Sequence, residues 1–192
     1  MRLTNYINNK LYFSSLDLAS IASQFGTPAF VYCQDTIERN FLEYKTAFQN
    51  SNHLVCYAVK ANSNLSILKL LKNLGSGFDI VSGGELHRVI QIGADPKKII
   101  FSGVGKSAQE IETAIINDVG SINIESEDEL DLVVQIAKQK QVQASVSLRV
   151  NPNVDPKTHP YIATGLKSSK FGVPIENAID IYKKMAKNKY LK

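Results

Sequence analysis

The stretch Leu54-Val55-Cys56-Tyr57-Ala58-Val59-Lys60 decides the fold that we predict for this chain. Its residues before the lysine are apolar throughout, without the apolar-polar alternation of a strand that has one face in water. Such an uninterrupted run is typical of a strand in a parallel sheet, whose two faces are covered by helices. The stretch therefore predicts an α/β protein.

The same pattern recurs along the rest of the chain. Short apolar runs predict further strands at residues 77–81, 98–102, 121–124 and 142–150. Between the strands, apolar residues recur at helical spacing, as in Leu65, Leu68, Leu71 and Leu74, and each such series predicts a covering helix. Strands and helices that alternate in this way build either an open sheet or a barrel of parallel strands.

The length of the chain bears on that choice. A (β/α)8 barrel needs about 250 residues, whereas this chain has 192. We therefore predict an incomplete TIM-type (β/α)8 barrel with about five parallel strands, followed by a helix over about residues 175–186, in preference to an open sheet.

The first part of the chain differs in character from the barrel pattern. It predicts a short helix over about residues 16–24, a strand at residues 28–33, and then a long helix for which Asp35 is the cap candidate. We accordingly predict two parts, an N-terminal segment of residues 1–35 and a partial barrel of residues 36–192.

Composition and charge narrow the class of function. The net charge of +4 comes from 22 basic and 18 acidic residues that are spread along the chain, so no basic patch for nucleic acid is apparent. No apolar run is long enough to span a bilayer, and three scattered histidines with two separated cysteines do not predict a metal site. Without a surface for nucleic acid, a small-molecule substrate is the default expectation. Both cysteines lie in apolar runs, which favours reduced thiols and a cytoplasmic protein.

Lys60 is the first candidate for chemistry. It follows directly on the predicted strand and precedes the polar stretch Ala61-Asn62-Ser63-Asn64. Active sites of parallel α/β proteins are built at that end of the strands, and a lysine amine there can form a Schiff base with an aldehyde. Position alone favours the simpler interpretation, a solvated lysine that ends a strand, so Lys60 needs supporting residues.

Several stretches resemble the diaminopimelate decarboxylases and, more loosely, the ornithine and arginine decarboxylases of the same fold. The matching stretches are YAVKANSN at 57–64, GSGFDIVSGGEL at 75–86, IIFSGVGK at 99–106, NIES at 123–126 and LRVNPNV at 148–154. The stretch THPYIATGLK at 158–167, followed by KFG at 170–172, resembles the diaminopimelate branch in particular. The resemblance extends from about Gly26 to Gly172.

This resemblance implies a pyridoxal 5'-phosphate enzyme of the alanine-racemase-like barrel class. Lys60 would hold the cofactor as a Schiff base, Asp79 and Arg149 would lie beside it, and Ala58 would pack beneath it. Without the motifs, Asp79 could equally be a helix cap and Arg149 a salt-bridged surface residue.

The resemblance also implies a reaction and a larger assembly. The family converts meso-2,6-diaminopimelate to L-lysine, the last step of lysine biosynthesis, as a homodimer. The N-terminal segment of residues 1–35 would associate with a C-terminal β-domain that this chain lacks, and the chain alone would be inactive. Another basic amino-acid decarboxylase of this fold and a cofactor-binding homologue without turnover remain as alternatives.

A long polar loop follows the predicted strand that ends near Arg149. His159, Tyr161 and Ile162 lie in this loop, at about residues 151–169, and its length favours a lid over the substrate rather than a simple connection. His159 does not match the cofactor-stacking histidine of the family, which would lie beyond Lys192.

Overall fold

The structure, a computed structural model, describes residues 4–154 and 171–192. Contacts between residues divide the chain into two compact units, Met1–Asn50 and Ser51–Lys192, and each is described by itself. The boundary predicted between residues 35 and 36 concerns association with another domain, and it stays a prediction.

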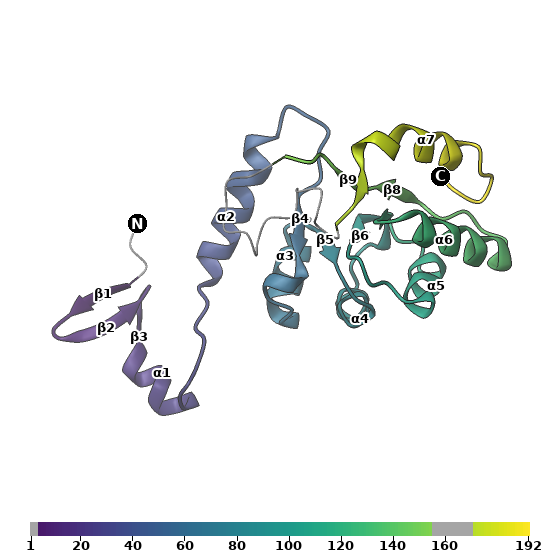
Figure 1. The fold of residues 1–192 in the computed structure, drawn as a ribbon. Coiled ribbons are helices and arrows are strands. Elements are labelled where there is room, and N and C mark those ends of the chain that lie inside the picture. The colour runs from purple at the N-terminus through teal and green to yellow at the C-terminus, as the bar shows by residue number, and fades with distance from the viewer. Residues whose placement is uncertain (1–3, 155–170) are drawn as a thin grey trace. The chain divides into compact units, whose positions relative to one another are not determined.

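The second unit is a parallel sheet with covering helices (Figure 1). Its strands lie in the sheet in the order in which they occur in the sequence, and all are parallel. They are β4 (Cys56–Ala58), β5 (Gly77–Ile80), β6 (Ile99–Phe101), β7 (Ser121–Ile124) and β8 (Val146–Leu148). The predicted α/β sheet of five parallel strands is confirmed.

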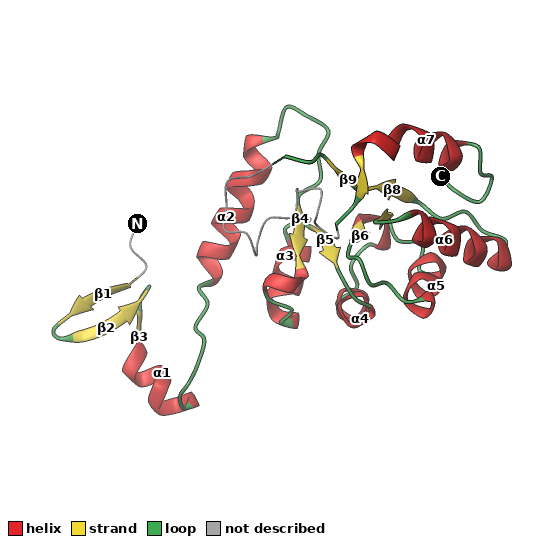
Figure 2. Cartoon of the chain, viewed as in Figure 1, coloured by secondary structure: helices red, strands yellow, loops and turns green. Residues whose placement is uncertain are grey.

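A helix follows each of the first four strands of this sheet, as the alternation in Figure 2 shows. These helices are α3 (Leu65–Asn73), α4 (Gly83–Gln91), α5 (Ala108–Ile116) and α6 (Glu127–Lys140), and short 3-10 turns precede α3 (η1, Val59–Ala61) and β6 (η2, Pro96–Lys98). Neighbouring helices contact one another in the order α3, α4, α5, α6 (Figure 1). They form one layer over the sheet.

Alternate residues of the strands build the core of this unit. Phe78 and Ile80 of β5 are fully buried, whereas Asp79 between them is half-buried, as expected from the two-residue period of a strand. Phe101 of β6 and Ile124 of β7 are likewise fully buried. One face of the sheet is therefore apolar and packed under helices, and the other carries polar side chains.

β4 differs from the prediction for a strand buried on both faces. Its residues Cys56, Tyr57 and Ala58 are all half-buried. The reason is its place at the edge of the sheet, where among the described residues it pairs with β5 alone.

Serine side chains start three of the helices at the carboxyl edge of the sheet. Ser82, Ser107 and Ser126 each accept a hydrogen bond from a backbone N–H in the first turn of α4, α5 and α6. At α5 the arrangement is a complete capping box with Glu110. These caps fix where each helix leaves the sheet.

The chain continues past β8 into a second, smaller pairing. β9 (Val150–Asn151) and β10 (Val173–Pro174) are parallel, and β10 leads into α7 (Ile175–Ala186), as predicted. After α7 the chain returns to β8, where Leu191 forms a parallel bridge with Ala144. The strand-helix repeat thus continues beyond the five-stranded sheet.

The first unit contains an antiparallel hairpin that the sequence analysis did not predict. β1 (Thr4–Ile7) pairs with β2 (Lys10–Phe13), and β2 pairs with β3 (Leu16–Asp17). The turn between β1 and β2 is made by Asn8 and Asn9, both with positive φ. Asparagine tolerates this conformation better than most residues, so two adjacent asparagines are a turn signal.

Two further expectations for the first unit are wrong. Residues 28–33 form no strand, because no described segment pairs with them. Helix α1 (Leu18–Phe25) precedes this stretch and α2 (Gln34–Ala47) follows it. The N-cap of α2 is Cys33, and Asp35 lies in the first turn, where a carboxylate still interacts favourably with the helix dipole.

Candidate active site

Lys60 lies where β4 ends, in the 3-10 turn η1. Its neighbour Val59 is fully buried and anchors the turn, while Lys60 itself is exposed. The following loop is held by hydrogen bonds: the Tyr57 hydroxyl donates to the Asn62 carbonyl (3.3 Å), and the Asn64 N–H donates to Asn62 Oδ1 (3.0 Å). The backbone that carries Lys60 is thus fixed on both sides.

Asp79 lies on the adjacent strand, on the face of the sheet that carries polar side chains. It is the register partner of Ala58, which precedes Lys60 by two residues. The Ser102 hydroxyl donates to Asp79 Oδ1 at 2.5 Å. Asp79 is not a helix cap, because Ser82 caps the helix that follows.

The thiol of Cys56 lies close enough to Asp79 to respond to its charge. Burial raises the pKa of the Cys56 thiol, and the negative charge of Asp79 raises it further. Neither Cys56 nor Cys33 forms a disulfide.

Arg149 follows β8 directly, at the same edge of the sheet. One of its guanidinium nitrogens lies 2.9 Å from Glu125 Oε1, and its side chain is 38% exposed. The guanidinium also lies over the ring of Phe171, 4.9 Å from its centre. Arg149 is therefore salt-bridged, as the alternative interpretation expected. It lies at the carboxyl edge of the sheet, and its place beside the cofactor stays a prediction.

Glu125 is a residue of this edge that the sequence analysis did not select. Its side chain is only 4% exposed, yet both oxygens are satisfied. Oε1 accepts from the Gly103 N–H (3.2 Å) and from Arg149 (2.9 Å), and Oε2 accepts from the Gly172 N–H (3.1 Å). Because a buried charge is costly unless it is paired, these donors explain how a carboxylate is kept here. Glu125 joins the ends of β6, β7 and β8.

Lys106 is a second buried charge near this edge, and its contacts mark it as structural. Its side chain is 0% exposed. The ammonium donates to the carbonyls of Gly103 (2.7 Å) and Asn123 (2.9 Å) and to Glu129 Oε1 (2.7 Å). All three of its protons are used, so it offers none to a ligand.

The predicted lid residues His159, Tyr161 and Ile162 lie outside the described residues. The segments that flank them meet beside Arg149. Asn151 Nδ2 donates to the Phe171 carbonyl (3.2 Å), and the Val173 N–H donates to the Arg149 carbonyl (2.8 Å).

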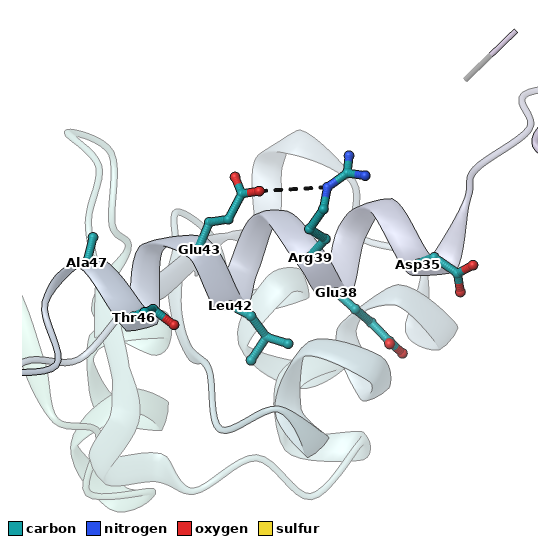
Figure 3. Close-up of a pocket in the computed structure, with 7 residues that line it drawn as sticks. All are labelled: Asp35, Glu38, Arg39, Leu42, Glu43, Thr46 and Ala47. Atoms are coloured by element: carbon teal, nitrogen blue, oxygen red, sulfur yellow. Dashed lines mark ion pairs between the residues drawn. The ribbon is translucent and has the colours of Figure 1, made fainter. Parts of the chain in front are cut away.

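A metal site and a surface hollow are the other kinds of candidate site to consider in the described part of the chain. It contains no group of three or more His, Cys, Asp and Glu side chains that could hold a metal ion. A surface hollow in the first unit is lined by Asp35, Glu38, Arg39, Leu42, Glu43, Thr46 and Ala47 (Figure 3). All of these lie on the one helix α2, and none is a predicted site residue.

No helix in the described part of the chain has both the length and the apolar character needed to cross a membrane.

The comparison with protein families defines the class. The family model for the pyridoxal binding domain of pyridoxal-dependent decarboxylases matches residues 34–192, so the chain belongs to this family. The cofactor of this family is the predicted pyridoxal phosphate.

Individual relatives narrow the resemblance to diaminopimelate decarboxylases. The diaminopimelate decarboxylase of Neisseria meningitidis serogroup A is 52% identical over 182 residues, which cover 95% of this chain and 45% of the relative. A crystal structure of the Helicobacter pylori diaminopimelate decarboxylase complexed with L-lysine matches with a TM-score of 0.88 and 46% identity. It covers 92% of this chain and 45% of that one. The resemblance and the fold, part of a TIM-type barrel, are confirmed.

A more distant relative shares the fold. The lysine decarboxylase of Selenomonas ruminantium matches with a TM-score of 0.71 and 28% identity, over 91% of this chain and 42% of that one. The chain therefore spans less than half the length of these relatives.

Proposed function

We propose that the protein to which this chain belongs decarboxylates meso-2,6-diaminopimelate to L-lysine, with pyridoxal phosphate attached to Lys60. The observation that carries the proposal is the place of Lys60. Its amine is exposed at the carboxyl end of β4, and the strand beside it presents Asp79 in register with Ala58. The level of identity to diaminopimelate decarboxylases supports the substrate.

The residues at this edge fit the cofactor chemically. Lys60 supplies an amine for an aldehyde, and Arg149 supplies a cation for an anionic group. Ala58, in register with Asp79, ends in a small methyl group against which the cofactor would pack. When bound, the cofactor supplies the electron sink for loss of the carboxylate.

The protein's own residues hold and orient the reacting groups. Asp79 can accept a hydrogen bond from a group held by Lys60, through the carboxylate oxygen that Ser102 does not occupy. The guanidinium of Arg149 is held by the carboxylate of Glu125 and by the ring of Phe171. The side chain is therefore already ordered before a ligand binds.

The alternatives are less well supported. A basic amino-acid decarboxylase of another specificity has a structural counterpart in the lysine decarboxylase of Selenomonas ruminantium, but at 28% identity. The diaminopimelate decarboxylase of Neisseria meningitidis reaches 52%. A homologue without turnover would keep Lys60 and the cofactor but release no carbon dioxide.

The remaining parts of the proposal follow from the family resemblance. The protein would be a cytoplasmic homodimer that acts on a small amino acid, and residues 1–35 would associate with a C-terminal β-domain. His159, Tyr161 and Ile162 would form a lid over the substrate. A protein consisting of these 192 residues alone would be inactive, since more than half the length of the relatives lies outside the match.

The test is release of carbon dioxide from meso-2,6-diaminopimelate by the full-length protein with added pyridoxal phosphate. Lys60→Ala should lower turnover by roughly a thousandfold or more, because the nucleophile is removed. Lys69→Ala is the matched control, since Lys69 is an exposed lysine of the next helix. Undiminished turnover in Lys60→Ala would disprove the role of this lysine, and release from L-lysine alone would favour the other specificity.

A further inference from the structure

A row of polar side chains crosses the face of the sheet that carries Asp79. Its members are half-buried and come from four neighbouring strands or their ends: Asp79, Ser102, Asn123, Ser147 and Ser121. They alternate along the strands with fully buried apolar residues such as Ile80 and Ile124. The row thus lies on the face opposite the packed core.

Hydrogen bonds connect the row without a gap. Ser102 Oγ donates to Asp79 Oδ1 at 2.5 Å, and Asn123 Nδ2 donates to Ser102 Oγ at 3.0 Å. Ser147 Oγ donates to Asn123 Oδ1 at 2.5 Å, and Ser121 Oγ donates to Ser147 Oγ at 3.2 Å. Every donor points along the row toward Asp79.

The direction of the hydrogen bonds in the row follows from Asp79, the residue at its end. A carboxylate only accepts, so Ser102 must give its single proton to Asp79. Ser102 can then only accept from Asn123, which turns the amide so that its oxygen faces Ser147. Ser147 must donate to that oxygen and accept from Ser121. One orientation of each side chain therefore satisfies the whole row.

Two features separate this row from ordinary cross-strand pairing. Threonine or serine pairs between strands can stabilise any sheet, but they have no reason to end on one carboxylate beside a reactive lysine. Moreover, Ser102 occupies only one oxygen of Asp79. When a hydrogen bond holds one oxygen of a carboxylate in place, the second oxygen points in a defined direction.

We propose that Ser102, Asn123 and Ser147 are positioning residues that orient the Asp79 carboxylate toward the group carried by Lys60. The inference rests on the proposed function, since it assigns to Asp79 a ligand held by Lys60. Polar side chains in the middle of a sheet cost stability unless they are paired. The hydrogen bonds of the row offset that cost and hold the Asp79 carboxylate in one direction.

The effect of breaking the row should decrease with distance from Asp79. In the full-length protein with pyridoxal phosphate, Ser102→Ala should lower kcat about tenfold, the size expected for a lost hydrogen bond to a charged group, and change KM little. Ser147→Ala should lower kcat less, and Ser121→Ala less again. Ser102→Thr keeps the hydroxyl and should restore most of the loss.

A spectroscopic measurement separates positioning from general stability. The visible absorbance of the cofactor bound to Lys60 should change its pH midpoint in Ser102→Ala, in the same direction as in Asp79→Asn but by less. Ser76→Ala is the control, because the Ser76 hydroxyl is buried and donates to the backbone of Gly77 (2.6 Å), away from the row. It should leave the midpoint unchanged.

A double-mutant cycle completes the test. If Ser102 acts through Asp79, Ser102→Ala should cost little further activity in the Asp79→Asn background. A loss of full size in that background, or a Ser102→Ala protein with the wild-type kcat and absorbance profile, would overturn the proposal. A wild-type protein that binds no cofactor would instead overturn the proposed function.

Discussion

Replacement of Glu125 tests the claim that the carboxyl edge is built around a buried carboxylate. Glu125 accepts hydrogen bonds from Arg149, Gly103 and Gly172 with a side chain that is 4% exposed. Glu125→Ala removes all of these acceptors and leaves the half-buried backbone N–H groups of Gly103 and Gly172 without a partner. It also leaves Arg149 without its counter-charge.

The magnitude follows from these contacts. Each buried donor left unsatisfied costs about 1–3 kcal/mol, and removing one partner of a buried ion pair costs about 3–5 kcal/mol. Because Arg149 is 38% exposed and can turn to water, we expect a total loss of about 3–5 kcal/mol rather than the full sum. Glu125→Gln keeps one acceptor oxygen and should lose less.

Two measurements check this prediction in the full-length protein. Urea unfolding should shift to a lower midpoint, in the order Glu125→Ala before Glu125→Gln. Amide hydrogen exchange should accelerate at Gly103 and Gly172, whose N–H groups lose their acceptor, but not at Gly77, which donates to the Val55 carbonyl (3.0 Å). If Glu125→Ala unfolded within about 0.5 kcal/mol of wild type and exchange at Gly103 did not change, the carboxylate would not organise this edge.

Two further predictions concern the same edge of the sheet. Gly172→Ala should destabilise the protein by about 1–3 kcal/mol in a thermal unfolding experiment, because Gly172 has a φ of +71° and an added Cβ would lie 2.8 Å from the Arg149 carbonyl oxygen. Gly84→Ala, at a site with open surroundings, should cost much less. The backbone N–H groups of Ser107 and Gly83 lower the pKa of Glu110 below its usual 4.5. A lowered pKa means that the ionised form stabilises the folded state, and this stability is lost as the pH falls through the folded-state pKa. Wild type should therefore lose more stability than Glu110→Gln when the pH is lowered below 4.5, and equal losses would contradict the role of that carboxylate.

The strand-helix order was predictable because each element of the barrel has a strong local pattern. The strand at residues 121–124 was predicted with the bounds that β7 has, and the helix of residues 175–186 with those of α7. The strand at residues 28–33 was wrong, since an apolar run becomes a strand only when another strand pairs with it. The hairpin of β1 and β2 was missed because its turn signal is only Asn8-Asn9.

Among the residues of the candidate site, too, some could be selected from the sequence and others could not. Asp79 and Arg149 were selected because the stretches that contain them resemble the family, and the resemblance implies that both lie beside the cofactor. Their partners Ser102 and Glu125 are 23 and 24 residues away in the chain and meet them only through the register of neighbouring strands. Glu125 directly follows β7, so a charged residue at the end of a strand was the available signal.

The most direct test of the account is chemical attachment of the cofactor. The full-length protein, loaded with pyridoxal phosphate and reduced with borohydride, would be digested and its labelled peptide identified by mass spectrometry. Because Lys60 lies at the carboxyl end of β4, where active sites of parallel barrels are built, we expect one label per chain, on Lys60. A label on another lysine, or the same labelling in Lys60→Ala, would contradict it.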